Sequence, residues 1–221
     1  MRTCIGNFRS INNRHSKLKL SINVIALTVS NQIYILVFDC FSDVGFVIDE
    51  SGSIDTQEWN AVLDFVRQIA DTINIPEGRA AVVAFSSGSR HPITFADHQT
   101  LIGFENALRG IGKVDGGTNI GAALEEARDI MFQASNGMRT NANVGHFLLL
   151  ITDGQDKGPD YIHWREEFAR LDIIVIAIGV GDGVNMATLA TLSPNNNYHA
   201  ATFDDLLSPE FRAQIRLCRG T

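Results

Sequence analysis

The sequence contains none of the short motifs that commonly mark a nucleotide-binding site or a hydrolase. Gly112-Lys113 is followed by Val114, so there is no phosphate-binding P-loop. There is no Gly-x-Ser-x-Gly nucleophile elbow, and the six histidines do not show the paired spacing of metal ligands. Because neither a nucleophile nor a general base can be identified, we do not expect this protein to be an enzyme.

Basic residues are scarce after the first 38 positions. The 221-residue chain has a formal net charge of −7, and residues 1–38 contain five basic residues and no acidic residue. Residues 39–221 therefore carry a net charge of −12. An acidic body without a basic stripe argues against nucleic acid or an anionic membrane as a partner. It suits a protein that binds cations.

A long uninterrupted apolar run is also missing. The uncharged stretch from Leu20 to Phe38 is broken by six polar residues, whereas a membrane-spanning helix needs about 20 predominantly apolar residues. A spanning helix is therefore less favoured here, and we expect no membrane insertion of the domain that follows. Residues 1–38 are interpreted as an N-terminal extension that precedes a domain at residues 39–221. The extension is either a secretory signal with its apolar part near residues 20–29, or a poorly ordered or non-native leader.

Residues 39–221 alternate short apolar runs with helical patterns, which predicts an α/β fold. We expect a doubly wound, mostly parallel open sheet with helices on both faces and one short antiparallel edge strand. The expected strands are Val44–Ile48, Ala80–Phe85, Ile93–Phe95, Phe147–Ile151, Ile173–Ile178 and Tyr198–Phe203. The expected helices are Asp55–Asn74, Gln99–Arg109, Asn119–Phe132, Asp160–Arg170, Met186–Leu192 and Pro209–Leu217.

Three short polar segments fall where these strands and helices meet. They are Asp49-Glu50-Ser51-Gly52-Ser53, Gly116-Gly117-Thr118-Asn119 and Thr152-Asp153-Gly154. Ligand sites in open α/β sheets form beyond the carboxyl ends of the strands, so the three segments should share one edge. The first segment alone could equally be a capping cluster for the helix that begins near Asp55. The three together favour a shared site.

Oxygen atoms dominate this predicted site. The candidate ligands are Asp49, Ser51, Ser53, Thr118 and Asp153. Carboxylate and hydroxyl oxygens are the ligands of a hard cation, and Mg²⁺ prefers near-octahedral oxygen coordination that retains some water. We therefore expect Mg²⁺ as the cofactor, with Mn²⁺ or Ca²⁺ as alternatives.

From about Asp43 to Cys218 the chain resembles the von Willebrand factor type A domain family. The resemblance rests on the three polar segments, on Leu-Leu-Ile-Thr-Asp-Gly and on Ile-Gly-Val-Gly at 178–181. It implies a Rossmann-like fold in which the five candidate ligands form a metal-ion-dependent adhesion site. It also implies that a carboxylate from a protein partner completes the coordination of the metal. The expected ligand is then a protein that offers an Asp or Glu, such as collagen or another matrix protein.

Loop residues around the metal should determine which ligand is selected. The rim candidates are Glu50, Asp115, Gln155, Asp156, Lys157 and the loop Ser86–His91. Each could instead be a solvated loop residue without a special role. Glu50 lies at a position that varies within the resembling family. Here it adds a negative charge beside the site, which would disfavour an anionic ligand.

The chain has only three cysteines. Cys40 precedes the first expected strand and Cys218 follows the last expected helix. Extracellular members of the resembling family often join such a terminal pair by a disulfide, which implies a secreted module, either alone or within a larger chain. The alternative is two unrelated thiols in an intracellular scaffold subunit that docks on an ATPase or another assembly. In resembling adhesion domains the last helix slides when ligand binds, and here Phe211 and Ile215 would anchor that helix in the core. We expect a Cys40–Cys218 disulfide to oppose the sliding and hold the domain near one state.

Overall fold

The computed structural model divides the chain into two units, which are described separately. Its described residues are 23–29, 32–38, 41–73, 75, 77–98, 100–141, 143–154 and 160–217. The units are Met1–Cys40 and Phe41–Thr221. In the first unit, β1 (Asn23–Val29) pairs antiparallel with β2 (Gln32–Phe38). The role of residues 1–38 as a signal or leader stays a prediction. Among the residues that the structure describes, no helix has the length and apolar character needed to cross a membrane.

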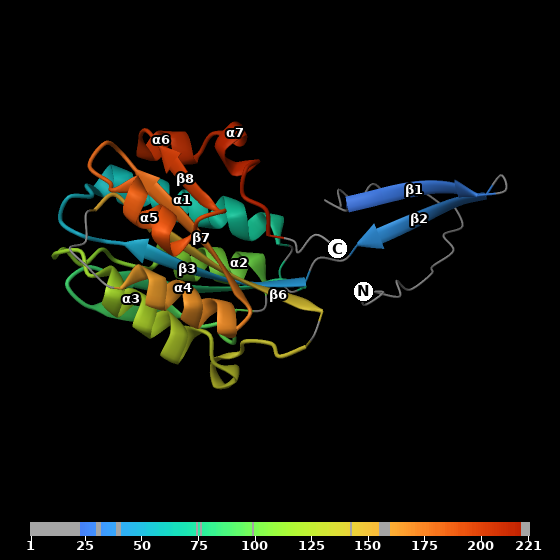
Figure 1. Cartoon of the computed structure of the whole chain (residues 1–221), viewed down its shortest axis with the longest axis horizontal. Helices are drawn as coiled ribbons and strands as arrows, with labels where there is room; N and C mark the ends of the chain where they lie inside the picture. The colour runs from blue at the N-terminus through green and yellow to red at the C-terminus, as the bar shows by residue number, and fades with distance from the viewer. Residues whose placement is uncertain are drawn as a thin grey trace. The chain divides into compact units, whose positions relative to one another are not determined.

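The second unit is built on a six-stranded sheet, shown in Figure 1. Its strands are β3 (Phe41–Asp49), β4 (Arg79–Phe85), β5 (Ser89–Ile93), β6 (Val144–Thr152), β7 (Ile173–Val180) and β8 (Asn197–Ala200). Their order is β5-β4-β3-β6-β7-β8, and only the edge strand β5 runs antiparallel to its neighbour. The predicted fold class is therefore confirmed. The central strands β3 and β6 pair with Ile48 opposite Ile151, so they end at the same level.

Helices cover both faces of this sheet. Val44, Phe46 and Ile48 of β3 share one apolar core with helices of the first layer, and Val47 belongs to the other core. The first layer contains α1 (Thr56–Thr72), α2 (Leu101–Arg109), α6 (Phe203–Leu206) and α7 (Pro209–Arg212). The second contains α3 (Ile120–Glu126), the π-helix η1 (Ala127–Met131), α4 (Tyr161–Arg170) and α5 (Met186–Leu192). Figure 1 shows α6 and α7 on the side of the sheet opposite α3 and α4. Because the centre of the sheet is buried on both faces, β7 and the middles of β3, β4 and β6 are continuous apolar runs in the sequence.

Helix α1 begins directly after the first polar segment, and its cap is Asp55. The Asp55 carboxylate accepts hydrogen bonds from the backbone N–H groups of Gln57 and Glu58, and the Glu58 carboxylate accepts from the Asp55 N–H. This reciprocal pair is a capping box. The helix therefore does not need Ser51 or Ser53 as its cap, which removes the simpler interpretation of those two serines.

Several expected element boundaries are wrong. The edge strand is Ser89–Ile93, not Ile93–Phe95, because its antiparallel register places Ser89 opposite Phe85 and Ile93 opposite Val82. Pro92 lies inside this strand and is exposed, as an edge position permits. The last strand ends at Ala200 instead of Phe203, since the Thr202 side chain caps α6. The expected helix Asn119–Phe132 is split into α3 and the π-helix η1.

The final helix is also much shorter than expected. Helix α7 ends at Arg212, and the chain continues without regular structure to Leu217, whose side chain is buried. The Leu217 carbonyl accepts a hydrogen bond from Ser42 Oγ at 2.6 Å. Phe211 is buried in the core as expected, and Ile215 packs against it while partly buried. Among the described residues, α7 is therefore too short to be the long final helix that was expected, and the predicted restraint of this segment by a disulfide stays a prediction.

Candidate metal centre

Asp49 is the last residue of β3, and its carboxylate is fixed by two hydrogen bonds. Oδ1 accepts from the backbone N–H of Ser51 at 2.9 Å, and Oδ2 accepts from Thr152 Oγ1 at 2.6 Å. Thr152 is the last residue of the neighbouring strand β6 and is itself fully buried. The side chain of Asp49 is 1% exposed. Its orientation is thus set by the adjacent strand and by the turn that follows it.

The environment of Asp49 disfavours a negative charge in the absence of a cation. Burial raises the pKa of its carboxyl from 3.8 to about 6. The hydrogen bonds from Thr152 and Ser51 oppose this shift, and the charge of Asp153 adds to it. A cation placed beside Asp49 would offset the desolvation and the repulsion between the two carboxylates. The energetics of this buried acid therefore fit a cation site.

The two serines connect Asp49 to the end of β6. Ser51 Oγ lies 3.1 Å from Ser53 Oγ, and Ser53 Oγ donates to Asp153 Oδ1 at 3.2 Å. Ser53 and Asp153 are 100 residues apart in sequence. The structure thus places four of the predicted metal ligands in one hydrogen-bonded chain across two strand ends.

Thr118 reaches the same place from the loop between α2 and α3. A Cβ atom added at Gly154 would lie 2.8 Å from both Oγ1 and Cγ2 of Thr118, so the threonine packs against the turn that carries Asp153. The Gly52 N–H donates to the Gly116 carbonyl at 3.0 Å, which joins the first and second polar segments directly. All five predicted ligand residues consequently lie at one edge of the sheet.

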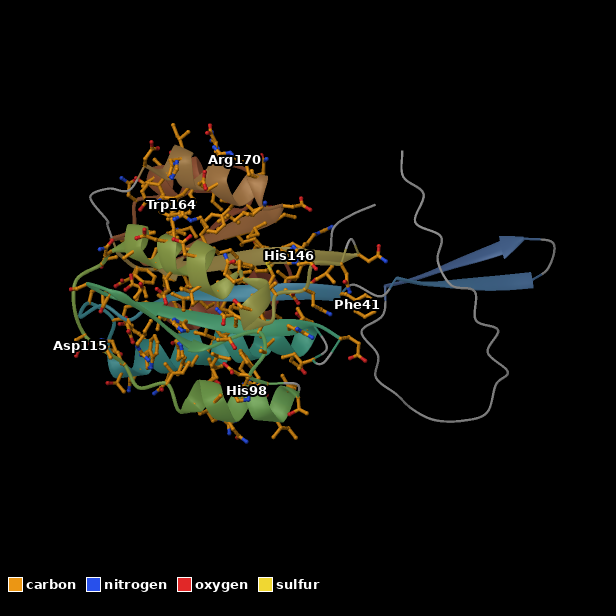
Figure 2. The ribbon with its side chains drawn as sticks, turned by 90° about the horizontal axis from the view of Figure 1, so that it is seen from below. Phe41, His98, Asp115, His146, Trp164 and Arg170 are labelled. Carbon is orange, nitrogen blue, oxygen red and sulfur yellow. The ribbon has the colours of Figure 1, made fainter. Side chains whose placement is uncertain are left out.

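The expected rim residues differ in their exposure and in their hydrogen-bond partners. Asp115 is exposed and forms an ion pair with Lys113. Figure 2 shows Asp115 at one end of the domain, whereas Phe41 and His146 lie at the other. In the loop Ser86–His91, the Ser86 carbonyl accepts from the Asn119 N–H and Ser87 Oγ accepts from the Gly117 N–H, both at 2.8 Å. Gln155, Asp156 and Lys157 lie outside the described residues.

Glu50 does not present a free charge to a ligand. Its side chain is 2% exposed and forms an ion pair with Arg90 of β5. Arg90 Nε donates to Glu50 Oε1 at 3.0 Å, and Nη2 donates to Oε2 at 2.6 Å. The negative charge is thus paired within the protein. The expectation that Glu50 repels an anionic ligand is not supported by this geometry.

A cleft of about 240 Å³ opens beside Asp153. Its lining residues come from α1, from the turn after β6, from the end of β7, from the segments after β7 and β8, and from α6: Glu58, Asp153, Val180, Gly181, Gly183, Ala201, Thr202 and Phe203. Small-molecule and cofactor pockets usually measure about 300–1,000 Å³. The cleft is therefore better suited to a single side chain than to an organic cofactor.

Sequence reasoning assigned no bond to Thr152 and placed Arg90 only within the rim loop. Thr152 immediately precedes the candidate ligand Asp153, and its position at the end of β6 beside the end of β3 could have suggested a bond to Asp49. Arg90 lies within the expected rim loop, but nothing in its local sequence indicates Glu50 as its partner. Cys40 and Cys218 lie outside the described residues, so their pairing stays a prediction.

The donor set of the candidate site consists of oxygen atoms alone. Its two carboxylates and three hydroxyls match the preference of Mg²⁺, Mn²⁺ and Ca²⁺ rather than that of softer metals. Among the described residues, no cluster of three or more His, Cys, Asp or Glu side chains offers an alternative metal site. The residues present therefore fit a hard divalent cation that retains part of its water shell.

Comparisons with known proteins identify the family of the chain and agree with its fold. The family model for the von Willebrand factor type A domain matches residues 43–213. Matrilin-1 from Bos taurus is 30% identical over 184 residues, which cover 80% of this chain and 33% of matrilin-1. Proximal thread matrix protein 1 from the mussel byssus, in its crystal form 2, superposes with a TM-score of 0.75 at 25% identity, covering 81% of this chain and 48% of that one. Another structure of that mussel protein has a zinc-occupied metal-ion-dependent adhesion site (MIDAS) motif. It superposes with a TM-score of 0.67 at 26% identity, and the match covers 75% of this chain and 42% of the mussel chain. This chain thus spans about a third of matrilin-1 and about half of the mussel protein.

Proposed function

Because the chain belongs to the von Willebrand factor type A domain family, we propose that it is an adhesion module that binds a protein ligand through a divalent cation. The cation is held at the edge of the sheet by Asp49, Ser51, Ser53, Thr118 and Asp153. The observation that carries this proposal is the hydrogen-bonded chain from Asp49 through both serines to Asp153. Ser51 and Ser53 take part in this chain although they are not needed as helix caps, since Asp55 caps the helix that follows.

The proposed cation is Mg²⁺, with Mn²⁺ and Ca²⁺ as possible substitutes. The two carboxylates balance the charge of a divalent ion, and the three hydroxyls add no further charge. A bound Mg²⁺ would offer an electrophilic position to a carboxylate oxygen of the partner. The mussel protein, whose MIDAS motif holds zinc, supports metal binding at this place in the fold. It does not identify the metal used by this chain.

The proposed ligand is a protein that presents an Asp or Glu side chain, such as collagen or another matrix protein. The cleft is lined by Asp153, one of the proposed metal ligands, so in this proposal it receives a side chain of the partner beside the metal. An extracellular setting is supported by the similarity to a matrix protein of the mussel byssus. The loop around Asp115 and the loop Ser86–His91 form the remaining rim.

Metal binding is tested first, by titrating Mn²⁺ and Mg²⁺ calorimetrically into the metal-free wild type and into Asp49→Ala. We expect one site in the wild type and its loss in the variant. Asp71→Ala is a matched control, because Asp71 is an exposed acid at the far end of α1. Equal metal affinity in wild type and Asp49→Ala would contradict the proposal.

Ligand binding is tested next on immobilised collagen, in Mg²⁺ and in EDTA. We expect retention in Mg²⁺ that EDTA and Asp49→Ala both abolish, while Asp71→Ala behaves as the wild type. Retention that is unchanged by EDTA would show that the metal does not mediate the contact. Failure to bind collagen with the metal site intact would direct the search to other carboxylate-bearing matrix proteins.

A further inference from the structure

We propose that Glu50 and Arg90 are positioning residues that hold the loop carrying Thr118 in the place that metal binding requires. This inference rests on the proposed function, because it assumes that Thr118 contributes to a cation site. It assigns to the Glu50–Arg90 pair an effect on metal affinity that neither residue could exert as a direct ligand. Glu50 adjoins Asp49 in sequence, and its carboxylate is buried and engaged with Arg90.

The pair contacts the loop between α2 and α3 at two points. Glu50 Oε2 accepts a hydrogen bond from the Val114 N–H at 3.0 Å, and Arg90 Nη2 donates to the Gly112 carbonyl at 2.6 Å. Both contacts are with the backbone, so they fix the path of the chain and do not depend on the side chains of the loop. The same two residues that neutralise each other thus also anchor the segment that leads to Thr118.

This loop needs such anchors because it has little structure of its own. Residues 111–119 form no helix or strand, and 112 and 114–117 are exposed. Three of its residues are glycine, the residue with the greatest backbone freedom to lose on ordering. Its second half is held separately, by Ser87 Oγ at the Gly117 N–H and by the Ser86 carbonyl at the Asn119 N–H. The Glu50–Arg90 pair therefore fixes the first half.

The loop contacts the first metal-ligand segment directly, just after the part that the Glu50–Arg90 pair holds. Gly116, two residues after Val114, accepts a hydrogen bond from the Gly52 N–H, which lies between Ser51 and Ser53. A shift of the loop would consequently disturb the serines as well as Thr118. If Arg90 were removed, Glu50 would remain as a buried and unpaired carboxylate, and such a charge forces its surroundings to rearrange until it is solvated. The rearrangement would begin one residue from Asp49.

Simple electrostatics predicts the opposite effect. Removing the positive charge of Arg90 makes the site more negative, and on charge alone Arg90→Met should bind a cation more tightly. Positioning predicts weaker binding, because the oxygen ligands are no longer held together. Partners that orient metal ligands typically alter metal affinity by about 10–100-fold, and we expect the lower end here because Ser86 and Ser87 still hold the second half of the loop. The sign of the change therefore separates the two explanations.

Arg139→Met provides a matched control at the other end of β3. Arg139 pairs with the fully buried Asp43 much as Arg90 pairs with Glu50: its Nε donates to Oδ1 at 2.8 Å and its backbone N–H donates to Oδ2 at 2.7 Å. Figure 2 shows His146, which lies 3.9 Å from the same carboxylate, at the end of the domain away from Asp115. Both substitutions leave a buried acid unpaired, so both should lower folding stability. Only Arg90→Met should change metal affinity.

The experiment is a calorimetric Mn²⁺ titration of wild type, Arg90→Met, Arg139→Met, Thr118→Ala and the Arg90→Met/Thr118→Ala double variant. We expect about tenfold weaker binding in Arg90→Met and unchanged binding in Arg139→Met. The effects of Arg90→Met and Thr118→Ala should be non-additive, because both act on the same loop. If Arg90→Met does not fold, Arg90→Lys replaces it, and an intermediate loss of affinity is expected because lysine cannot reproduce the planar fork.

The outcomes distinguish this inference from the proposed function. A wild type that binds no Mn²⁺ would overturn both. A wild type that binds Mn²⁺ while Arg90→Met, or Arg90→Lys in its place, binds with equal or greater affinity would overturn the positioning role alone. Full additivity with Thr118→Ala would do the same, and so would an equal loss of affinity in Arg139→Met, which would indicate a general effect of destabilisation.

Discussion

The raised pKa of Asp49 predicts that the metal-free domain becomes more stable when this residue loses its charge. The carboxyl has a pKa of about 6 in the folded protein against an ordinary value of 3.8. At pH 7 its ionised form therefore costs the folded state about 3 kcal/mol, since one pKa unit corresponds to about 1.36 kcal/mol. Asp49→Asn removes this cost, and the amide can still accept from the Ser51 N–H. We expect a gain that approaches but does not exceed this value.

The predicted gain depends on pH with a definite sign. Because the folded pKa lies above the unfolded one, the cost is absent below about pH 3.8, grows between about pH 4 and 6 and is complete above pH 6. Lowering the pH from 7 to 4.5 should therefore remove most of the difference in stability between Asp49→Asn and the wild type. This contribution of Asp49 is the difference between the two proteins, which cancels the titration of the other acids.

The assay is urea unfolding of wild type and Asp49→Asn in EDTA at several pH values, repeated with Mg²⁺. In EDTA the variant should be the more stable protein at pH 7, and the two should converge towards pH 4. Added Mg²⁺ should stabilise the wild type by an amount that grows with its concentration, and should leave the variant unchanged. A variant that is equally or less stable than the wild type at pH 7 in EDTA would refute the reasoning.

Three further predictions concern the loops and the chain ends. Gly154→Ala should weaken Mn²⁺ binding in calorimetry more than it lowers the unfolding midpoint, because the new Cβ would meet Thr118 Oγ1 at 2.8 Å; unchanged affinity would contradict the placement of Thr118. Gly137→Ala should destabilise the domain by about 2 kcal/mol in urea without altering Mn²⁺ affinity, since its φ is +90° and a Cβ would lie 2.5 Å from the Ala96 nitrogen. A disulfide between Cys40 and Cys218 should appear in non-reducing peptide mapping of secreted protein and contribute about 5 kcal/mol in the chain-entropy model. The hydrogen bond from Ser42 to Leu217 brings the neighbours of the two cysteines together, and finding both thiols free would refute the pairing.

The sequence was sufficient to predict the sheet and the edge at which the candidate site lies. The centres of β3, β6 and β7 are buried on both faces, so the segments Val44–Ile48, Phe147–Ile151 and Ile173–Ile178 appear as uninterrupted apolar runs. Parallel strands joined through helices end at one edge, and this rule alone brings Asp49 and Asp153 together. Both inferences depend on periodicity and chain direction, which are local properties of the sequence.

Side-chain partners across the sheet were not predictable in the same way. Glu50 could be assigned to the rim from its position beside Asp49, but its burial and its pairing with Arg90 depend on how β5 folds back against β4. Likewise, the cap of α1 could have been a serine of the first polar segment or Asp55. The geometry of the turn selects Asp55, because its carboxylate reaches two N–H groups of the first helical turn.

The C-terminal segment also shows which features depend on local sequence and which depend on tertiary contacts. The pattern after Pro209 is compatible with a helix as far as Leu217, yet α7 ends at Arg212. The chain leaves the helix so that Leu217 can bury its side chain and bond to Ser42 at the start of β3. Local sequence therefore determined the fold class, the core strands and the five candidate ligands, because these follow from hydrophobic periodicity and from residue chemistry. Only the tertiary structure decided where the helix stops, which acid is neutralised and what holds the Thr118 loop, because those depend on contacts between residues far apart in the chain.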